Sequence, residues 1–284
     1  MDKISGFINL NKPSWISSAA AVSKIKKLTG VPCGHMGTLD PLASGVLPVA
    51  VGNAARLFQY LLDKQKTYRA VFRFGIGTDT LDCTGEVYCE NMPVPDEESI
   101  RGVLARFTGE IMQMPPAFSA KSIGGVRAYK LAREGKEVAL QPKAVRIDGL
   151  ELIGKTGADS YEFLIRCGGG TYVRSIGRDV AECLGTCAVM TSLVREKSGY
   201  FSLENSVSLE DLACRGWKDC LIAPDTVFEM PALCYSGHLA KRIGYGQTIA
   251  ADEDDGLYKL YLDGSFYGVA AVNGGLLKAK TKVC

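Results

Sequence analysis

The sequence lacks an apolar run long enough to cross a membrane. A spanning helix needs about 18 or more consecutive apolar residues, and no stretch of these 284 residues approaches that length. The first seven residues also lack the basic segment and apolar core that begin a signal peptide. The sequence therefore predicts a cytoplasmic protein without a membrane partner.

The sequence also lacks the ligand spacing of a zinc site. It contains two histidines, His35 and His238, and its ten cysteines include no Cys-x-x-Cys pair. Cysteines that are scattered through a long chain without a signal peptide are typically reduced. We therefore expect free thiols, no disulfide and no metal site.

Hydrophobic spacing predicts both helices and strands. Apolar residues recur at helical spacing in residues 19–28, 53–62, 97–107, 173–184 and 209–214. Ser17 is expected to cap the first of these helices and Thr171 the fourth. Strands are expected at residues 7–10, 46–51, 66–75, 161–165 and 190–197. Short alternating runs separated by Asp-Gly and Asn-Gly turns predict a small β module from about residue 231.

Residues 149–156 match the P-loop expression G-x-x-x-x-G-K-[ST] letter for letter. A P-loop is a flexible turn that leads from a strand into a helix. Here the four intervening residues are Leu-Glu-Leu-Ile, which is a strand pattern, and a second strand follows. We therefore expect a strand at this position and no site for ATP or GTP.

Basic residues concentrate in one segment. The whole chain has a formal net charge of only +2, but residues 118–146 hold seven Lys or Arg against two Glu. A concentrated basic face suits phosphate binding, because each neutralised phosphate releases counterions. Such a segment is usually an ordinary solvated face, so charge alone does not establish RNA binding.

Residues 34–52 place one aspartate on a shaped loop beside the core. Gly34, Gly37 and Pro41 surround Asp40, and an apolar run at residues 46–51 follows. Pro41 disfavours the α region for the residue before it, which holds the Asp40 carboxylate in an extended or turn geometry. An isolated Asp-Pro pair is commonly only a turn, so the surrounding residues must decide its role.

The string Gly-His-x-Gly-Thr-Leu-Asp-Pro at residues 34–41 resembles the catalytic-aspartate motif of the tRNA pseudouridine-55 synthases, the TruB-type pseudouridine synthase family. Further segments that match this family in order stand at residues 66–69, 78–82, 170–175 and 193–195. The resemblance implies an α+β fold in which a mixed, largely antiparallel sheet is flanked by helices. It also implies a catalytic domain at residues 1–230 and a small RNA-binding β domain of the PUA type at residues 231–284.

The resemblance implies roles for five side chains. Asp40 corresponds to the catalytic carboxylate, and Arg174 is expected to pair with it and keep it ionised. Tyr68 and Leu193 correspond to residues that lie against the target base, and His35 helps to fill the space that this base leaves. Simpler roles remain open, since Tyr68 alternates as a core residue of its strand and His35 would also satisfy the loop backbone.

The implied reaction is the isomerisation of uridine to pseudouridine at position 55 in the TΨC loop of tRNA, after the nucleotide has been flipped out of the stack. Asp40 acts either as a nucleophile on the ribose or base, or as the base that removes a ribose proton. Neither route requires a cofactor.

The basic segment at residues 118–146 corresponds to the family's RNA-clamping insertion. Lys121, Arg127 and Lys130 are its expected RNA contacts, the T arm of tRNA is the expected partner, and the protein is expected to be a monomer. The alternatives are a pseudouridine synthase that acts on another RNA and a non-catalytic RNA-binding protein.

Overall fold

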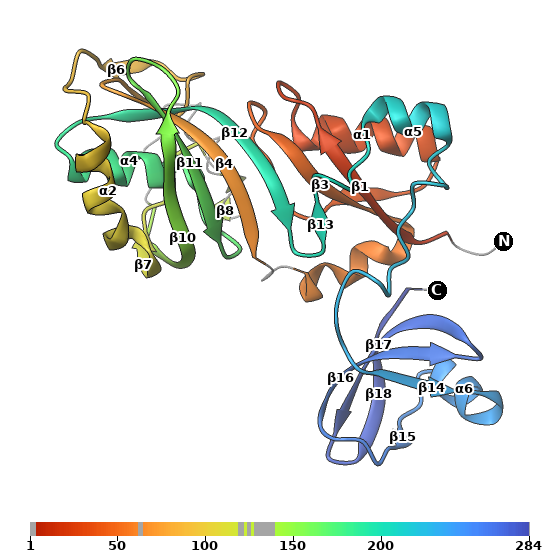
Figure 1. Ribbon diagram of the computed structural model, residues 1–284. Helices are drawn as coiled ribbons and strands as arrows, with labels where there is room; N and C mark the ends of the chain where they lie inside the picture. Colours follow the sequence, from red (N-terminus) through yellow and green to blue (C-terminus); the bar gives the residue numbers. More distant parts are fainter. Residues whose placement is uncertain (1–3, 62–64, 119–121, 124–125, 128–139, 284) are drawn as a thin grey trace. The chain divides into compact units, whose positions relative to one another are not determined.

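The computed structural model describes residues 4–61, 65–118, 122–123, 126–127 and 140–283 (Figure 1). The chain divides into two compact units, which are described separately. Unit 1 comprises residues 1–41, 45–62 and 199–284, and unit 2 comprises residues 42–44 and 63–198. In the described part of the chain no helix has both the length and the hydropathy needed to span a membrane.

The described helices are α1 (Ser18–Thr29), α2 (Glu97–Leu104), α4 (Val173–Cys183), α5 (Leu209–Arg215), α6 (Gly237–Gly244) and the 3-10 helices η1 (Gly52–Tyr60) and η2 (Ala105–Phe107). The described strands of unit 1 are β1 (Gly6–Lys12), β2 (Cys33–His35), β3 (Ser44–Val51), β13 (Phe201–Ser202), β14 (Ala232–Tyr235), β15 (Ile249–Ala250), β16 (Gly256–Leu262), β17 (Ser265–Asn273) and β18 (Leu276–Lys282). Those of unit 2 are β4 (Lys66–Phe74), β5 (Gly77–Thr78), β6 (Val87–Cys89), β7 (Gly109–Gln113), β8 (Ser122–Ile123), β9 (Val126–Arg127), β10 (Lys143–Lys155), β11 (Ser160–Cys167) and β12 (Ala188–Ser198).

Unit 2 is built on an antiparallel sheet with the strand order β12-β4-β11-β10-β7. Helices α2 and α4 pack against each other and on this sheet (Figure 1). Aromatic rings fill the interior, and Phe72 of β4 meets Phe163 of β11 edge to face at 5.3 Å between centroids. The predicted mixture of antiparallel strands and flanking helices is confirmed, so the chain is an α+β protein.

The central strand β4 has the alternating burial that was predicted for residues 66–75. Tyr68 and Phe72 lie on its buried face, whereas Arg69 lies on the opposite face. There the Arg69 guanidinium bridges two neighbouring strands, with Nε 2.8 Å from Glu196 and Nη1 3.0 Å from Glu162. Arg69 therefore joins β4 to its two neighbours, β11 and β12, on the side of the sheet opposite Tyr68.

All but the last residue of the segment that matches the P-loop expression lies in β10, so the predicted strand is confirmed. Its first glycine, Gly149, is paired with Arg166 of the antiparallel strand β11. A Cβ atom at Gly149 would come within 2.9 Å of the Arg166 guanidinium. The glycine therefore makes room for a side chain on the next strand, and no helix follows β10.

Unit 1 begins with an antiparallel pair of strands, β1 and β3, and β2 extends it along β3. The predicted ends of α1 are confirmed. The Ser17 side chain accepts a hydrogen bond from the backbone N–H of Ala20, and Gly30 closes the helix in the left-handed conformation at φ 68°.

Residues after 231 form the predicted β module, a sheet with the strand order β14-β16-β17-β18-β15. It has a core of its own, in which Ile243 of α6 packs with Leu260 and Leu277. Val269 and Val283 contribute instead to a second core together with β1 and η1 of the same unit. The domain boundary at residue 231 and the PUA assignment stay predictions.

Two helix predictions were wrong in detail. The helix predicted at residues 53–62 begins as the 3-10 helix η1 (Gly52–Tyr60) rather than as an α-helix, and residue 62 lies outside the described residues. The Leu61 N–H donates to the Phe58 carbonyl at the end of η1, and Phe58 is exposed. Thr171 does not cap α4, because its hydroxyl donates to the Gly168 carbonyl behind it. The N-cap residue is Tyr172, which makes no side-chain capping bond.

The expectation that all thiols are free was also wrong. Cys89 of β6 and Cys187, which precedes β12, form a disulfide across 98 positions of sequence. Sequence spacing does not reveal such a pair, because the two cysteines meet only when the β5-β6 hairpin lies beside the start of β12.

Candidate active site

Asp40 lies in the loop between β2 and β3, half-buried and fixed on both sides. Before it, the Ser18 hydroxyl donates to the Leu39 carbonyl at 2.8 Å and accepts from the Leu39 N–H at 2.9 Å. After it, the buried Lys12 ammonium reaches the Pro41 carbonyl at 3.4 Å. The predicted shaped loop is present. His35 precedes it as the last residue of β2, opposite Val49 of β3.

Tyr68 and Leu193 come together on one face of the sheet in unit 2. Leu193 of β12 is directly opposite Ala70 of β4, so it is a diagonal neighbour of Tyr68. Both side chains are buried. Helix α4 covers this face so closely that a Cβ atom at Gly177 would lie 2.4 Å from the ring of Phe72.

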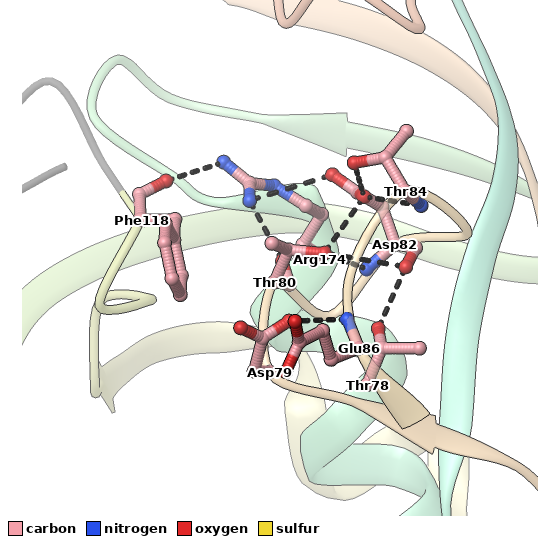
Figure 2. A network of polar contacts seen from close by, with 8 residues as sticks. All are labelled: Thr78, Asp79, Thr80, Asp82, Thr84, Glu86, Phe118 and Arg174. Carbon is pink, nitrogen blue, oxygen red and sulfur yellow. Dashed lines mark hydrogen bonds and ion pairs between the residues drawn. The ribbon is translucent and has the colours of Figure 1, made fainter. Parts of the chain in front are cut away.

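Arg174 lies in the first turn of α4, on the face of the sheet that holds Tyr68 and Leu193, and it is 6% exposed. Its described partners come from two loops of unit 2 (Figure 2). Nη1 donates to the Thr80 carbonyl at 2.7 Å and lies 3.5 Å from the Asp82 carboxylate, and Nη2 donates to the Phe118 carbonyl at 3.0 Å. The predicted pairing of Arg174 with Asp40 joins two units and stays a prediction.

Asp82 is the buried acid of this network, with 5% of its surface exposed. One carboxylate oxygen accepts from the Thr80 hydroxyl at 2.8 Å and from the Thr84 N–H and hydroxyl at 3.0 and 2.5 Å. The other oxygen faces Arg174 (Figure 2). Each of these contacts presents a donor to the carboxylate, which accepts on both oxygens. The Asp82 charge also acts on the adjacent thiol, because partial burial and then this charge raise the pKa of Cys83.

The loop that carries Asp82 is held in a strained conformation. Leu81 has φ 61°, a value that a branched side chain rarely adopts. It is fixed against β12, because the Met190 N–H donates to the Leu81 carbonyl and the Met190 carbonyl accepts from the Cys83 N–H, both at 3.0 Å. This left-handed residue stands between Thr80 and Asp82, and the Thr80 carbonyl and the Asp82 carboxylate both face the Arg174 guanidinium.

Helix α4 also supports the strand and loop that lead into the basic segment. The buried Gln113 amide pairs with both backbone groups of Tyr172, accepting at 2.8 Å and donating at 3.1 Å. Ser175 and Arg178 both donate to the Met114 carbonyl, at 2.9 and 3.0 Å. One helix therefore fixes residues 113–118 and the Asp82 loop together.

The predicted RNA contacts of the basic segment are only partly visible. The backbone of Arg127 belongs to β9, which pairs with β8. Lys121 and Lys130 lie outside the described residues. Their role stays a prediction.

An open groove of about 800 Å³ lies beside the C-terminal half of α4. It contains none of the predicted site residues. It is lined by Arg106, Phe107, Ile111, Met112, Met114, Pro142, Arg178, Asp179, Glu182 and Cys183. Within the described ranges, no three His, Cys, Asp or Glu side chains group closely enough to hold a metal ion.

Besides Lys12, sequence reasoning missed two charged residues that the fold buries, Asp82 and Arg195. Asp82 belongs to the matched segment at residues 78–82, whose run of threonines around two aspartates was the available signal. Arg195 is 1% exposed and lies directly opposite Tyr68. Its position two residues after Leu193 on the same strand placed it on the same face.

The sequence of the chain matches named proteins over most of its length. Residues 25–173 match the family described as "TruB family pseudouridylate synthase (N terminal domain)". A protein of Acaryochloris marina named "tRNA pseudouridine synthase B" is 38% identical, with 97% of each chain covered. A protein of Aquifex aeolicus with the same name is 37% identical over 97% of this chain and 98% of the relative.

Solved structures share the fold. The "Crystal Structure of a Cbf5-Nop10-Gar1 Complex" contains a chain that matches 98% of this chain with a TM-score of 0.73 at 23% identity, and the match covers 85% of that chain. A chain in the "Structure of H/ACA RNP bound to a substrate RNA containing 2'-deoxyuridine" matches with a TM-score of 0.72 and the same coverage. The family model covers half of the chain and the full-length relatives exceed 30% identity, so the predicted family is confirmed: the chain belongs to the TruB family of pseudouridylate synthases.

Proposed function

We propose that this protein isomerises uridine to pseudouridine at position 55 in the TΨC loop of tRNA, with Asp40 as the catalytic residue. The observation that carries the proposal is the full-length similarity to proteins named tRNA pseudouridine synthase B, 38% identical over 97% of both chains. The fixed loop around Asp40 supports it further, since Ser18 and Lys12 bind the carbonyls on either side of this residue.

The reaction breaks the bond between C1′ of the ribose and N1 of uracil, rotates the base and joins C1′ to C5. The proton on C5 is lost and N1 gains one, so substrate and product are isomers. Asp40 attacks the ribose or base, or removes a ribose proton. Arg174 pairs with Asp40 and keeps it ionised, while Tyr68 and Leu193 lie against the base and His35 fills the space that it leaves.

The basic segment at residues 118–146 clamps the RNA through Lys121, Arg127 and Lys130. Binding energy comes mainly from phosphate contacts, which explains how an enzyme with a net charge of only +2 holds tRNA. The protein acts as a cytoplasmic monomer without a cofactor. The alternatives are a synthase for another RNA and a non-catalytic RNA-binding protein.

The test uses a tRNA transcript whose uridines carry tritium at C5, because forming the new bond releases that tritium. Wild-type protein should release the tritium of one uridine per tRNA and none from a transcript with cytidine at position 55. Asp40→Asn should abolish release while tRNA affinity stays within about tenfold, since the phosphate contacts remain.

The matched control is Asp219→Asn, which removes an exposed carboxylate elsewhere in unit 1 and should keep the wild-type rate. Near wild-type release from Asp40→Asn would remove this residue from the mechanism. Release that persists from the cytidine-55 transcript would contradict the proposed position.

A further inference from the structure

Trp15 stands in the loop between β1 and α1 with 67% of its surface exposed. Its backbone has φ 67°, in the left-handed region that glycine adopts without cost and bulky residues avoid. An exposed ring gains little from folding, so burial does not compensate for this strain. Strained residues of this kind persist at sites that contact ligands.

The Trp15 loop is fixed to the segment that carries Asp40. The Trp15 N–H donates to the Pro41 carbonyl at 2.6 Å. The fully buried Lys12 ammonium holds the loop from inside, binding the carbonyls of Pro13 at 2.9 Å, Ile16 at 2.8 Å and Pro41 at 3.4 Å. The indole is therefore presented by a backbone anchored one residue away from the proposed catalytic aspartate.

The helix that follows Trp15 is basic. Helix α1 begins three residues later, and its sequence contains Lys24, Lys26 and Lys27 but no acidic residue. All three lysines are exposed. A single exposed hydrophobic side chain is ordinary on protein surfaces, but here it combines backbone strain, two anchors and an adjacent basic helix.

We propose that Trp15 is a stacking platform for an unpaired nucleobase of the substrate RNA, next to the uridine that enters the site. Aromatic rings beside a basic surface bind single-stranded nucleic acid because every base has a π face and every nucleotide a phosphate. The inference rests on the proposed function and adds to it a contact that selects RNA loops with an accessible base.

The discriminating substitution is Trp15→Gly. Glycine keeps the N–H that binds Pro41 and relieves the strain at φ 67°, so the melting temperature should stay equal or rise. Affinity for a T-arm stem–loop should nevertheless fall by about 5- to 150-fold, the range for loss of one stacked base. Trp15→Phe keeps a ring and should bind within about threefold of wild type.

A spectroscopic test is independent of catalysis. The chain has two tryptophans, so Trp217→Phe leaves Trp15 as the only one. Binding of the stem–loop should quench its fluorescence, and an abasic position at the stacked base should abolish the quenching. Wild-type affinity in Trp15→Gly, or fluorescence that RNA does not change, would overturn the inference and leave the ring for another partner. Failure of wild-type protein to modify tRNA would refute the proposed function while leaving this binding test to decide on Trp15.

Discussion

Replacing Asp82 with asparagine tests the buried network around Arg174. The carboxylate is an acceptor on both oxygens, one toward Arg174 and the other toward Thr80 and Thr84. Asparagine has one acceptor and one donor group in the same space. In either orientation its NH2 group faces a donor, against Arg174 or against the Thr84 N–H, so no rotation restores the network.

The magnitude follows from burial. Asp82 and Arg174 are 5% and 6% exposed, so Asp82→Asn leaves a buried guanidinium with less compensation for its charge. Removing one partner of a buried ion pair costs roughly 3–5 kcal/mol. We expect the lower end, about 3 kcal/mol, because asparagine keeps one acceptor and Arg174 keeps the carbonyls of Thr80 and Phe118.

The assay is urea unfolding at neutral pH, in which a loss of about 3 kcal/mol lowers the midpoint by about 1 M for a slope of about 3 kcal/mol per M. Asp79→Asn is the matched control, since Asp79 lies in the same loop but is exposed. A second measurement reports the effect of the Asp82 charge on the neighbouring Cys83 thiol. The pKa of Cys83, measured by alkylation against pH, should fall in Asp82→Asn because the carboxylate helps to raise it. An unchanged midpoint together with an unchanged thiol pKa would refute this role of the Asp82 side chain.

Two further predictions concern stability. Gly177→Ala should lower the free energy of unfolding by about 1–3 kcal/mol, because its Cβ would meet the Phe72 ring at 2.4 Å. Its control is Gly102→Ala on α2, which has open space around it and should raise the free energy of unfolding by up to about 1 kcal/mol. Equal urea midpoints for the two variants would contradict this packing. Tyr261→Phe should cost about 1 kcal/mol at pH 8 by removing the bond to Asp225. Burial and then this bond raise the pKa of Tyr261 to about 12. The hydroxyl therefore contributes fully to the free energy of unfolding below pH 10, and this contribution is lost as the pH rises through 12. A difference in stability between wild type and variant that persists undiminished above pH 12 would contradict the bond to Asp225.

The parts of the fold that depend on local pattern could be predicted. The Ser17 cap, the Gly30 stop and the alternation of β4 follow from preferences of single residues and from a period of two. The strand inside the P-loop expression followed from its apolar spacing. The strand β7 was missed because its five residues carry no alternation that separates them from the adjoining loop.

Contacts between distant segments could not be predicted from pattern. The position of Arg174 in the first turn of a helix indicated that a partner must hold it, but the acid that lies 3.5 Å away, Asp82, is 92 positions earlier in the chain. The pairing of Cys89 with Cys187 is of the same kind. Such pairs form because the fold places two distant loops side by side on the sheet. This placement cannot be inferred from the spacing of residues within either loop.

The shared support given by α4 has a thermodynamic consequence. Arg174 binds the Phe118 carbonyl and Asp82 with the same guanidinium, while Ser175 and Arg178 hold Met114. A displacement of residues 114–118 when RNA binds the basic segment that begins there therefore changes the hydrogen bonds of Arg174 directly. Binding free energy at that segment and the position of the guanidinium are coupled, and coupling of this kind is reciprocal. A change in the charge of Asp82 should therefore alter RNA affinity at the basic segment.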